Sequence, residues 1–205
     1  VYEEVLQRLK EAGADWVQID EPALALDLVP NERDALKFAC AKLAAAAPGL
    51  KLMLATYFGE LGDNLETALA LPVAGLHLDL VRAPQQLDAV LSTARKDLVL
   101  SLGVIDGRNI WRADLPVILE RLEATVSARE AGIEVAPSCS LLHVPIDLDL
   151  ETALDADVKS WLAFAAQKMD ELSLLARALN EGRDAVAAGL AASVEAIAAR
   201  AASAK

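Results

Sequence analysis

The stretch DWVQIDEPAL, residues Asp15–Leu24, decides how this sequence folds. Its apolar residues, Trp16, Val17 and Ile19, predict a short strand that is buried on both faces, as in a parallel sheet. Pro22 has no amide hydrogen for a sheet ladder, so the strand should end before it. Asp20 and Glu21 then stand at the carboxyl end of the strand, where α/β enzymes hold catalytic groups. The alternative is that both acids only cap the next turn.

Outward from this stretch, strand and helix patterns alternate along the chain. Further strands, each nearly continuously apolar, are predicted at Leu52–Tyr57, Gly75–Val81, Leu98–Ile105 and Glu134–Ala136. Helices are predicted at Val1–Ala12, from Asn31 or Asp34 to Ala47, after the loop Gly59–Asn64, from Pro84, from Asp114 to Ala131, at Asp157–Asn180 and at Arg183–Ala202. This alternation predicts an α/β fold with a parallel sheet.

The number of predicted strands indicates an incomplete barrel. A closed (β/α)8 TIM barrel takes roughly 250 residues, and this chain of 205 residues has strands for about five βα units. The first helix begins without a capping Ser, Thr, Asp or Asn, so we expect a cut inside a longer chain. Residues 1–180 should be a partial barrel and residues 181–205 an Ala-rich connector helix. An open five-stranded sheet is the alternative.

Charge and cysteine content indicate which binding partners and which cellular compartment to expect. The net charge is −12 and no basic stripe is visible, which disfavours nucleic acid and anionic membranes as partners. Cys40 and Cys139 form no Cys-x-x-Cys pair, as expected in a reducing cytoplasm. We predict no apolar stretch of the roughly 18 residues that a membrane span needs. The N-terminal residues do not show the pattern of a signal peptide.

Polar side chains follow the carboxyl end of every predicted strand. Because parallel strands end at one rim of a sheet, these side chains are expected to converge on one pocket. The candidate substrate-binding residues are Asp20, Glu21, Tyr57, Asp79, Asp106, Arg108, Ser138 and Cys139.

These residues do not predict a metal centre or a catalytic nucleophile. A catalytic zinc takes three protein ligands, and only Asp79 and Cys139 are plausible ones. His77 is interpreted as a hydrogen-bonded core histidine, and His143, beside Pro145, as structural. Cys139 has no evident histidine partner, so a buried, inert thiol is the commoner case. Neither a dinucleotide fingerprint nor a P-loop is present.

Six motifs, in this order and spacing, resemble the N-terminal domain of cobalamin-independent methionine synthase, a 5-methyltetrahydropteroyltriglutamate–homocysteine methyltransferase. They are WVQIDEPAL, LATYFGELGDNL, VAGLHLDLVRAP, LSLGVIDGRNIWR, VAPSCSLLHVP and SWLAFAAQKMDEL. The resemblance covers nearly the whole chain. It implies an enzyme of two duplicated barrels, of which this chain is the later part of the first barrel and the start of the connector.

The resemblance places the chemistry outside this chain. In the family a zinc in the second barrel holds the homocysteine thiol as thiolate. By the duplication, Asp79 and Cys139 fall on two zinc ligands and Asp20 on a substrate-binding acid. Tyr57 and Gly59 fall on a His-x-Cys pair that they cannot replace as ligands. The resemblance therefore implies a decayed rim with no cofactor here, and a zinc in the absent C-terminal domain.

We therefore expect a scaffolding fragment that is inactive alone. Its partners would be the C-terminal catalytic barrel and, in the full enzyme, methyltetrahydrofolate polyglutamate and homocysteine. The alternative is a self-sufficient, metal-free TIM-barrel lyase or decarboxylase, with Asp20 and Asp79 as an acid pair and Arg108 as an anion clamp. A third possibility is an assembly module that pairs through its open strand edges.

Overall fold

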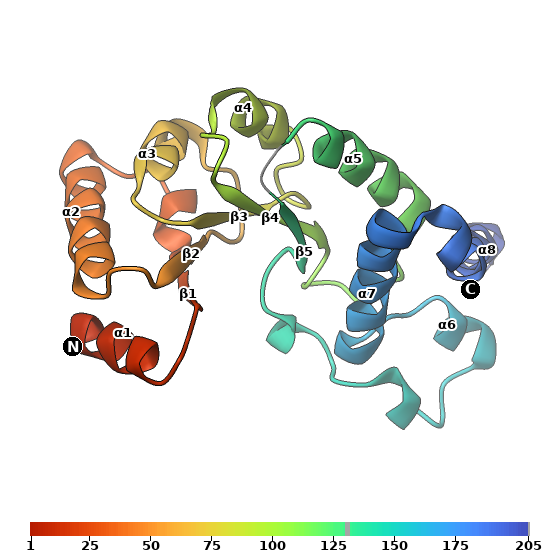
Figure 1. Ribbon diagram of the computed structural model, residues 1–205. Helices are drawn as coiled ribbons and strands as arrows, with labels where there is room; N and C mark the ends of the chain where they lie inside the picture. Colours follow the sequence, from red (N-terminus) through yellow and green to blue (C-terminus); the bar gives the residue numbers. More distant parts are fainter. Residues whose placement is uncertain (130–131, 205) are drawn as a thin grey trace. The chain divides into compact units, whose positions relative to one another are not determined.

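The computed structural model describes residues 1–129 and 132–204 (Figure 1). Within these residues, one five-stranded sheet has the strand order β1-β2-β3-β4-β5. The strands are β1 (Trp16–Asp20), β2 (Lys51–Ala55), β3 (Gly75–Asp79), β4 (Val99–Ile105) and β5 (Ile133–Pro137). β1 pairs with β2, and β2 with β3, in parallel. The predicted α/β fold with a parallel sheet is confirmed.

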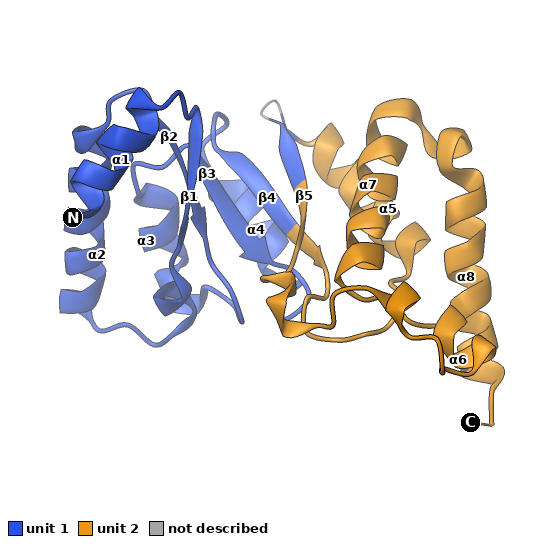
Figure 2. Cartoon of the chain, turned by 90° about the horizontal axis from the view of Figure 1, so that it is seen from below, with its two compact units in different colours: residues 1–102, 129–134 blue, residues 103–128, 135–205 orange. Residues whose placement is uncertain are grey.

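Helices separate the strands and complete the chain. They are α1 (Tyr2–Glu11), α2 (Pro30–Ala46), α3 (Leu65–Ala70), α4 (Gln86–Thr93), α5 (Leu115–Ser127), α6 (Ala156–Ser160), α7 (Ala165–Glu181) and α8 (Ala187–Ala202). The chain divides into two compact units (Figure 2). Unit 1 comprises Val1–Leu102 and Arg129–Glu134, and unit 2 comprises Gly103–Ala128 and Val135–Lys205.

Unit 1 is built on the apolar strands β2 and β3. Leu54 and Leu76, which are paired across these strands, are both buried. Figure 1 shows α2 and α3 on the same side of the strands of this unit. The prediction that β1 is buried on both faces was wrong, because Gln18 and Asp20 are exposed. β1 stands at the edge of the sheet and has only β2 as a neighbour in the strand order, so one face stays polar.

Unit 2 is held by helix packing. α5 contacts both α7 and α8. Leu119 of α5 and Leu175 of α7 are fully buried, as the apolar stripes of both helices require. A second cluster of buried side chains consists of Leu148, Leu162 and Phe164, with Ile110 and Val158 packed against it.

The helix predicted at Asp157–Asn180 is two helices. α6 and α7 are separated by residues 161–164, which are buried and pair with the segment after β4. The amide of Arg112 donates to the carbonyl of Trp161 at 3.0 Å, and the amide of Ala163 donates to the carbonyl of Ile110 at 2.8 Å. These bonds take main-chain groups that a continuous helix would have used itself.

Several predicted helix ends also differ. Asn31 and Asp34 do not cap α2, because Pro30 is its first residue and the Val29 amide donates to the Glu32 carboxylate at 3.0 Å. The helix predicted to reach Ala131 is described to its end at Ser127, and Ala131 lies outside the described residues.

The C-terminal helix contradicts the prediction that no stretch is long and apolar enough to span a membrane. Gly182, with φ of 91°, ends α7 as predicted, and a 3-10 turn at Arg183–Val186 leads into α8. By length and composition, Arg183–Ala202 is long and apolar enough to cross a membrane, contrary to our reading of the sequence. A single helix of this kind is weak evidence for a membrane span. Here alanine supplies most of the apolar character, and α8 packs on α5.

The packing of unit 2 predicts where its stability resides. Leu119→Ala should lower the free energy of unfolding by about 2–5 kcal/mol, because it leaves a cavity in the α5 contact. Leu142→Ala is the matched control, since Leu142 is 92% exposed, and it should change stability by less than about 0.5 kcal/mol. Urea unfolding followed by circular dichroism measures both, and equal losses would contradict the assigned core.

Candidate functional site

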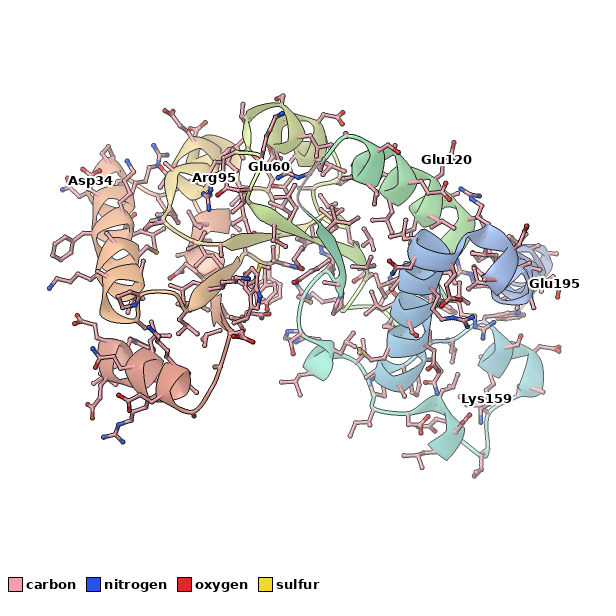
Figure 3. All side chains as sticks on the ribbon, viewed as in Figure 1. Asp34, Glu60, Arg95, Glu120, Lys159 and Glu195 are labelled. Carbon is pink, nitrogen blue, oxygen red and sulfur yellow. The ribbon has the colours of Figure 1, made fainter. Side chains whose placement is uncertain are left out.

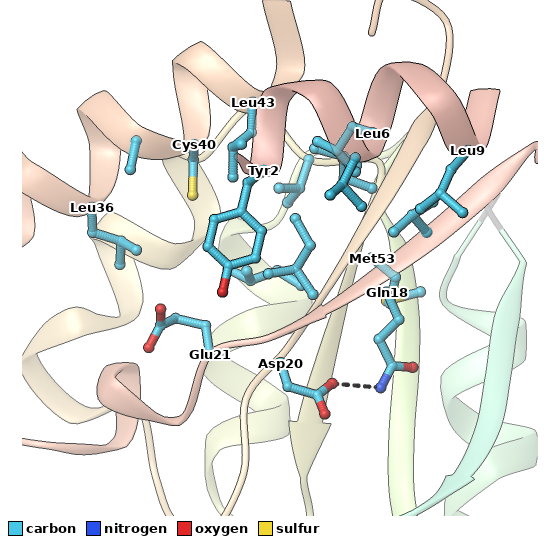
Figure 4. A pocket seen from close by; sticks show the side chains of 17 residues that line it. Tyr2, Leu6, Leu9, Gln18, Asp20, Glu21, Leu36, Cys40, Leu43 and Met53 are labelled. Carbon is cyan, nitrogen blue, oxygen red and sulfur yellow. Dashed lines mark hydrogen bonds between the residues drawn. The ribbon is translucent and has the colours of Figure 1, made fainter. Parts of the chain in front are cut away.

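In unit 1, three polar side chains meet at the end of β1. The Gln18 amide donates to the Asp20 carboxylate at 2.7 Å (Figure 4) and to the Tyr57 hydroxyl at 2.9 Å. The Tyr57 hydroxyl donates to the same Asp20 oxygen at 3.0 Å. Gln18 and Asp20 share the exposed face of β1 because alternate residues of a strand point the same way. The result is an exposed carboxylate whose direction is set by two donors, able to accept a hydrogen bond from a ligand.

Two other predicted acids of unit 1 are used by their own loops. Glu21 accepts the amide of Ala23 at 3.0 Å and so begins the 3-10 turn Pro22–Ala25. Asp79 is 1% exposed, and its carboxylate accepts the amides of Val81 at 3.1 Å and Arg82 at 2.9 Å. These contacts give Glu21 and Asp79 structural roles in the turns after β1 and β3.

His77 lies in the core, as predicted. It is buried, and its Nδ1 is 2.9 Å from the Ser101 hydroxyl. Its ring meets the Tyr57 ring edge-on, with centroids 5.5 Å apart. The Thr56 hydroxyl donates to the His77 carbonyl at 2.6 Å, which ties the ends of β2 and β3 together.

A cavity of about 600 Å³ lies in unit 1 between α1, α2 and the β1–β2 pair (Figure 4). Its walls are mainly apolar and include Tyr2, Leu6, Leu9, Leu36, Cys40 and Leu43. Burial raises the pKa of the Cys40 thiol, and the nearby charge of Glu21 raises it further. Both effects disfavour the reactive thiolate, so this cavity lacks an activated nucleophile at Cys40.

In unit 2, the candidate residues gather on the loop after β4. The Asp106 carboxylate accepts the amide of Arg108 at 2.8 Å through Oδ1 and the side-chain amide of Asn109 at 2.8 Å through Oδ2. The Ser138 hydroxyl accepts the Gly107 amide at 3.2 Å, and the Ser138 amide donates to the Ile105 carbonyl at 2.7 Å. Arg108 is exposed. The loop thus presents a carboxylate and a guanidinium from a fixed backbone.

Cys139 supports this loop by close packing. It is 2% exposed, and a Cβ atom at Gly107 would lie 2.7 Å from the Cys139 carbonyl oxygen and 3.0 Å from its Sγ. Only glycine allows this approach of the two chain segments. Cys139 therefore acts here as a packing residue.

The residues present do not fit the catalytic zinc that the family resemblance implies for the other barrel. In the part of the chain that the structure describes, no group of three or more His, Cys, Asp or Glu side chains is placed to hold a metal ion. The Asp79 carboxylate accepts two main-chain amides, and Cys139 packs on Gly107. No chemistry through a metal is assigned to this chain.

Sequence reasoning missed two charged residues of α7. Most charged side chains, among them Asp34, Glu120 and Glu195, lie on the surface (Figure 3). Lys168 is only 1% exposed and Glu171 only 8%. Burial lowers the pKa of the Lys168 ammonium and raises the pKa of the Glu171 carboxyl. The one available signal was a Lys and a Glu three positions apart in an otherwise amphipathic helix.

The Lys168 and Glu171 side chains bind the segment after β4. The Lys168 ammonium donates to the Trp111 carbonyl at 3.2 Å and to Oδ1 of Asn109 at 3.4 Å. Glu171 accepts the amide of Ala113 at 3.0 Å. The loop that carries Asp106 is therefore anchored to α7.

The parallel sheet, the intervening helices and the polar strand ends define an α/β protein of TIM-barrel type. A solved structure of this kind, the putative vitamin-B12 independent methionine synthase from Listeria monocytogenes, has a TM-score of 0.62. The match covers 88% of this chain and 52% of that one at 19% identity, which speaks to the fold alone. Residues 1–130 match the family described as cobalamin-independent synthase, N-terminal domain, and the chain belongs to that family.

Curated relatives agree with this assignment. The 5-methyltetrahydropteroyltriglutamate–homocysteine methyltransferase of Mesorhizobium japonicum is 73% identical over 100% of this chain and 26% of that protein. The protein of the same name from Caulobacter vibrioides is 62% identical over 99% of this chain and 26% of its own length. The chain thus spans about a quarter of the length of these relatives. The resemblance stated from the six motifs is confirmed.

The contact between Gly107 and Cys139 leads to a test. Gly107→Ala should lower the free energy of unfolding by about 1–3 kcal/mol, because its methyl group would overlap the Cys139 carbonyl. Gly132→Ala is the control, since a Cβ there meets nothing within 4 Å. Chemical denaturation of both variants decides the matter, and an unchanged stability of Gly107→Ala would refute the contact.

Glu171 should make stability depend on pH. Its pKa is raised from 4.5, so above that pH the unfolded state loses this proton before the folded state does. Stability that is present below pH 4.5 is therefore lost as pH rises through the folded-state pKa. Glu171→Gln has no ionisable proton at this position, so it removes this pH dependence of stability. Relative to wild type, the variant should gain stability as the pH rises above 4.5 in urea titrations. A constant difference across this range would contradict the shift.

Proposed function

We propose that this chain is the later part of the N-terminal barrel of an enzyme that moves the methyl group of 5-methyltetrahydropteroyltriglutamate to homocysteine. The observation that carries the proposal is the 73% identity to a protein of that name over the whole chain. Because the chain spans about a quarter of that relative, the activity is assigned to the whole protein. Residues 1–180 would form the partial barrel and residues 181–205 the connector.

The contacts of the strand-end residues support a scaffolding role. Glu21, Asp79 and Ser138 accept main-chain amides, and Cys139 packs against Gly107. These contacts hold loops in place. The methyl transfer is therefore assigned to the C-terminal catalytic barrel, with the zinc that the family carries there as the group that holds the homocysteine thiolate.

Two places on this chain are the candidates for substrate contact. Asp20, braced by Gln18 and Tyr57, presents an exposed carboxylate in unit 1. Asp106 and Arg108 present opposite charges on one loop of unit 2. We propose that they contact methyltetrahydrofolate polyglutamate or homocysteine in the assembled enzyme, with Arg108 suited to a carboxylate.

We also propose a cytoplasmic location, on the basis of the two thiols. Cys40 and Cys139 are both buried, and no disulfide joins them. Free thiols persist in a reducing compartment, and this supports a cytoplasmic enzyme.

A methyl-transfer assay tests the proposal. This chain alone, given the folate donor, homocysteine and zinc, should form no methionine above the uncatalysed background, because the thiolate-holding barrel is absent. The whole protein that contains it should turn over. Failure of the whole protein to form methionine would overturn the proposal.

Turnover by the short chain would favour the self-sufficient alternative instead. In that case Asp20→Ala and Arg108→Ala should each abolish activity in the short chain. Asp34→Ala, an exposed acid on α2, is the control that should leave any activity unchanged.

A further inference from the structure

Lys168 is a buried cation whose position is not explained by packing alone. It is the largest of the fully buried side chains in the described residues, at 1% exposed. Removing an ammonium from water is unfavourable unless hydrogen bonds replace the lost hydration. A leucine or methionine would fill the same space on α7 without that penalty. The partners of the ammonium therefore indicate what Lys168 does.

Those partners fix the orientation of one side-chain amide. Oδ1 of Asn109 accepts from the Lys168 ammonium at 3.4 Å and from the Trp111 main-chain amide at 3.0 Å. Both of these groups only donate, so the oxygen of the Asn109 amide must face them. Nδ2 of Asn109 is then directed to Asp106, where it donates to Oδ2 at 2.8 Å. Lys168 thus reaches the Asp106 carboxylate through a single intervening side chain.

The rest of the loop is held from the same side by α7 and α8. Glu171 accepts the Ala113 amide at 3.0 Å. The Ser193 hydroxyl accepts the Leu115 amide at 3.2 Å and donates to the Ala113 carbonyl at 2.7 Å. These bonds fix the far end of the loop, and at its near end Asn109 is bonded to Asp106, Trp111 and Lys168.

We propose that Lys168 is a positioning residue: through the Asn109 amide it holds the Asp106 carboxylate in one direction, ready to accept a hydrogen bond from an N–H or O–H group of the methyl-transfer substrates. This inference rests on the proposed function. Lys168 itself is not proposed to touch substrate.

The first experiment measures the amide directly in this chain. Hydrogen exchange of the Asn109 side-chain amide is followed by NMR in wild type, in Lys168→Met and in Lys159→Met, with the Leu119 main-chain amide as a reference for overall stability. In Lys168→Met the Asn109 amide should exchange about tenfold faster relative to Leu119. Lys159 lies nearer the surface and donates to the Glu151 carbonyl, so Lys159→Met should match wild type.

Two NMR results would overturn the proposal. One is an unchanged Asn109 exchange rate in Lys168→Met. The other is a parallel rise at Asn109 and Leu119, which would mean that Lys168 only stabilises the fold. Should Lys168→Met not fold, Asn109→Ala cuts the same connection while leaving the Trp111 contact of Lys168, and it replaces Lys168→Met in the kinetic experiment.

The second experiment is a double-mutant cycle in the whole methyltransferase. Lys168→Met and Asp106→Asn should each raise KM for one of the two substrates about tenfold with kcat little changed, and the double variant should equal Asp106→Asn alone. Multiplying effects, or no effect of Asp106→Asn, would overturn the positioning role. If the whole protein transfers no methyl group, the proposed function fails, and the NMR result still decides whether Lys168 orients Asn109.

Discussion

Main-chain amides at the carboxyl ends of parallel strands are the constraint on which this structure depends. Where a strand stops and the chain turns, its amides lose their sheet partners and need others. Here a side chain from the same strand end supplies them: Glu21 after β1, Asp79 after β3 and Asp106 after β4. After β5, Ser138 serves the neighbouring loop through Gly107. One physical need therefore places acids and hydroxyls where an enzyme of this architecture would place reactive groups.

The strand-end acids differ in how exposed they are and in which groups they bind. The Asp79 carboxylate is buried and accepts two amides of its own turn, so its role is to hold that turn. Asp20 is exposed and is held by side chains instead, from Gln18 and Tyr57. A carboxylate braced by side chains on an exposed face keeps access to solvent and ligands. An acid at a strand end is thus a weak functional signal until its partners are known.

Local sequence patterns predicted most of the fold. Apolar runs placed β2, β3 and β4 to within one or two residues, and Gly182 ended α7 because a positive φ favours glycine there. The break between α6 and α7 escaped prediction, because residues 161–164 are helix-compatible by themselves. They leave the helix to bond Ile110 and Arg112, about 50 residues earlier in the chain. Periodicity cannot report a partner at that distance in sequence.

The candidate site shows the same limit more sharply. Motif order led to Asp106 and Arg108, yet Lys168 and Glu171, which bind the segment that follows them, lie on a helix that read as ordinary amphipathic structure. A charge on a helix is usually solvated, so sequence alone favoured the surface for both. Their burial follows from the break before α7, because the bonds of residues 161–164 to Ile110 and Arg112 bring the loop after β4 to the start of that helix. The feature that sequence analysis missed in the fold is therefore also the reason that it missed the supports of the site.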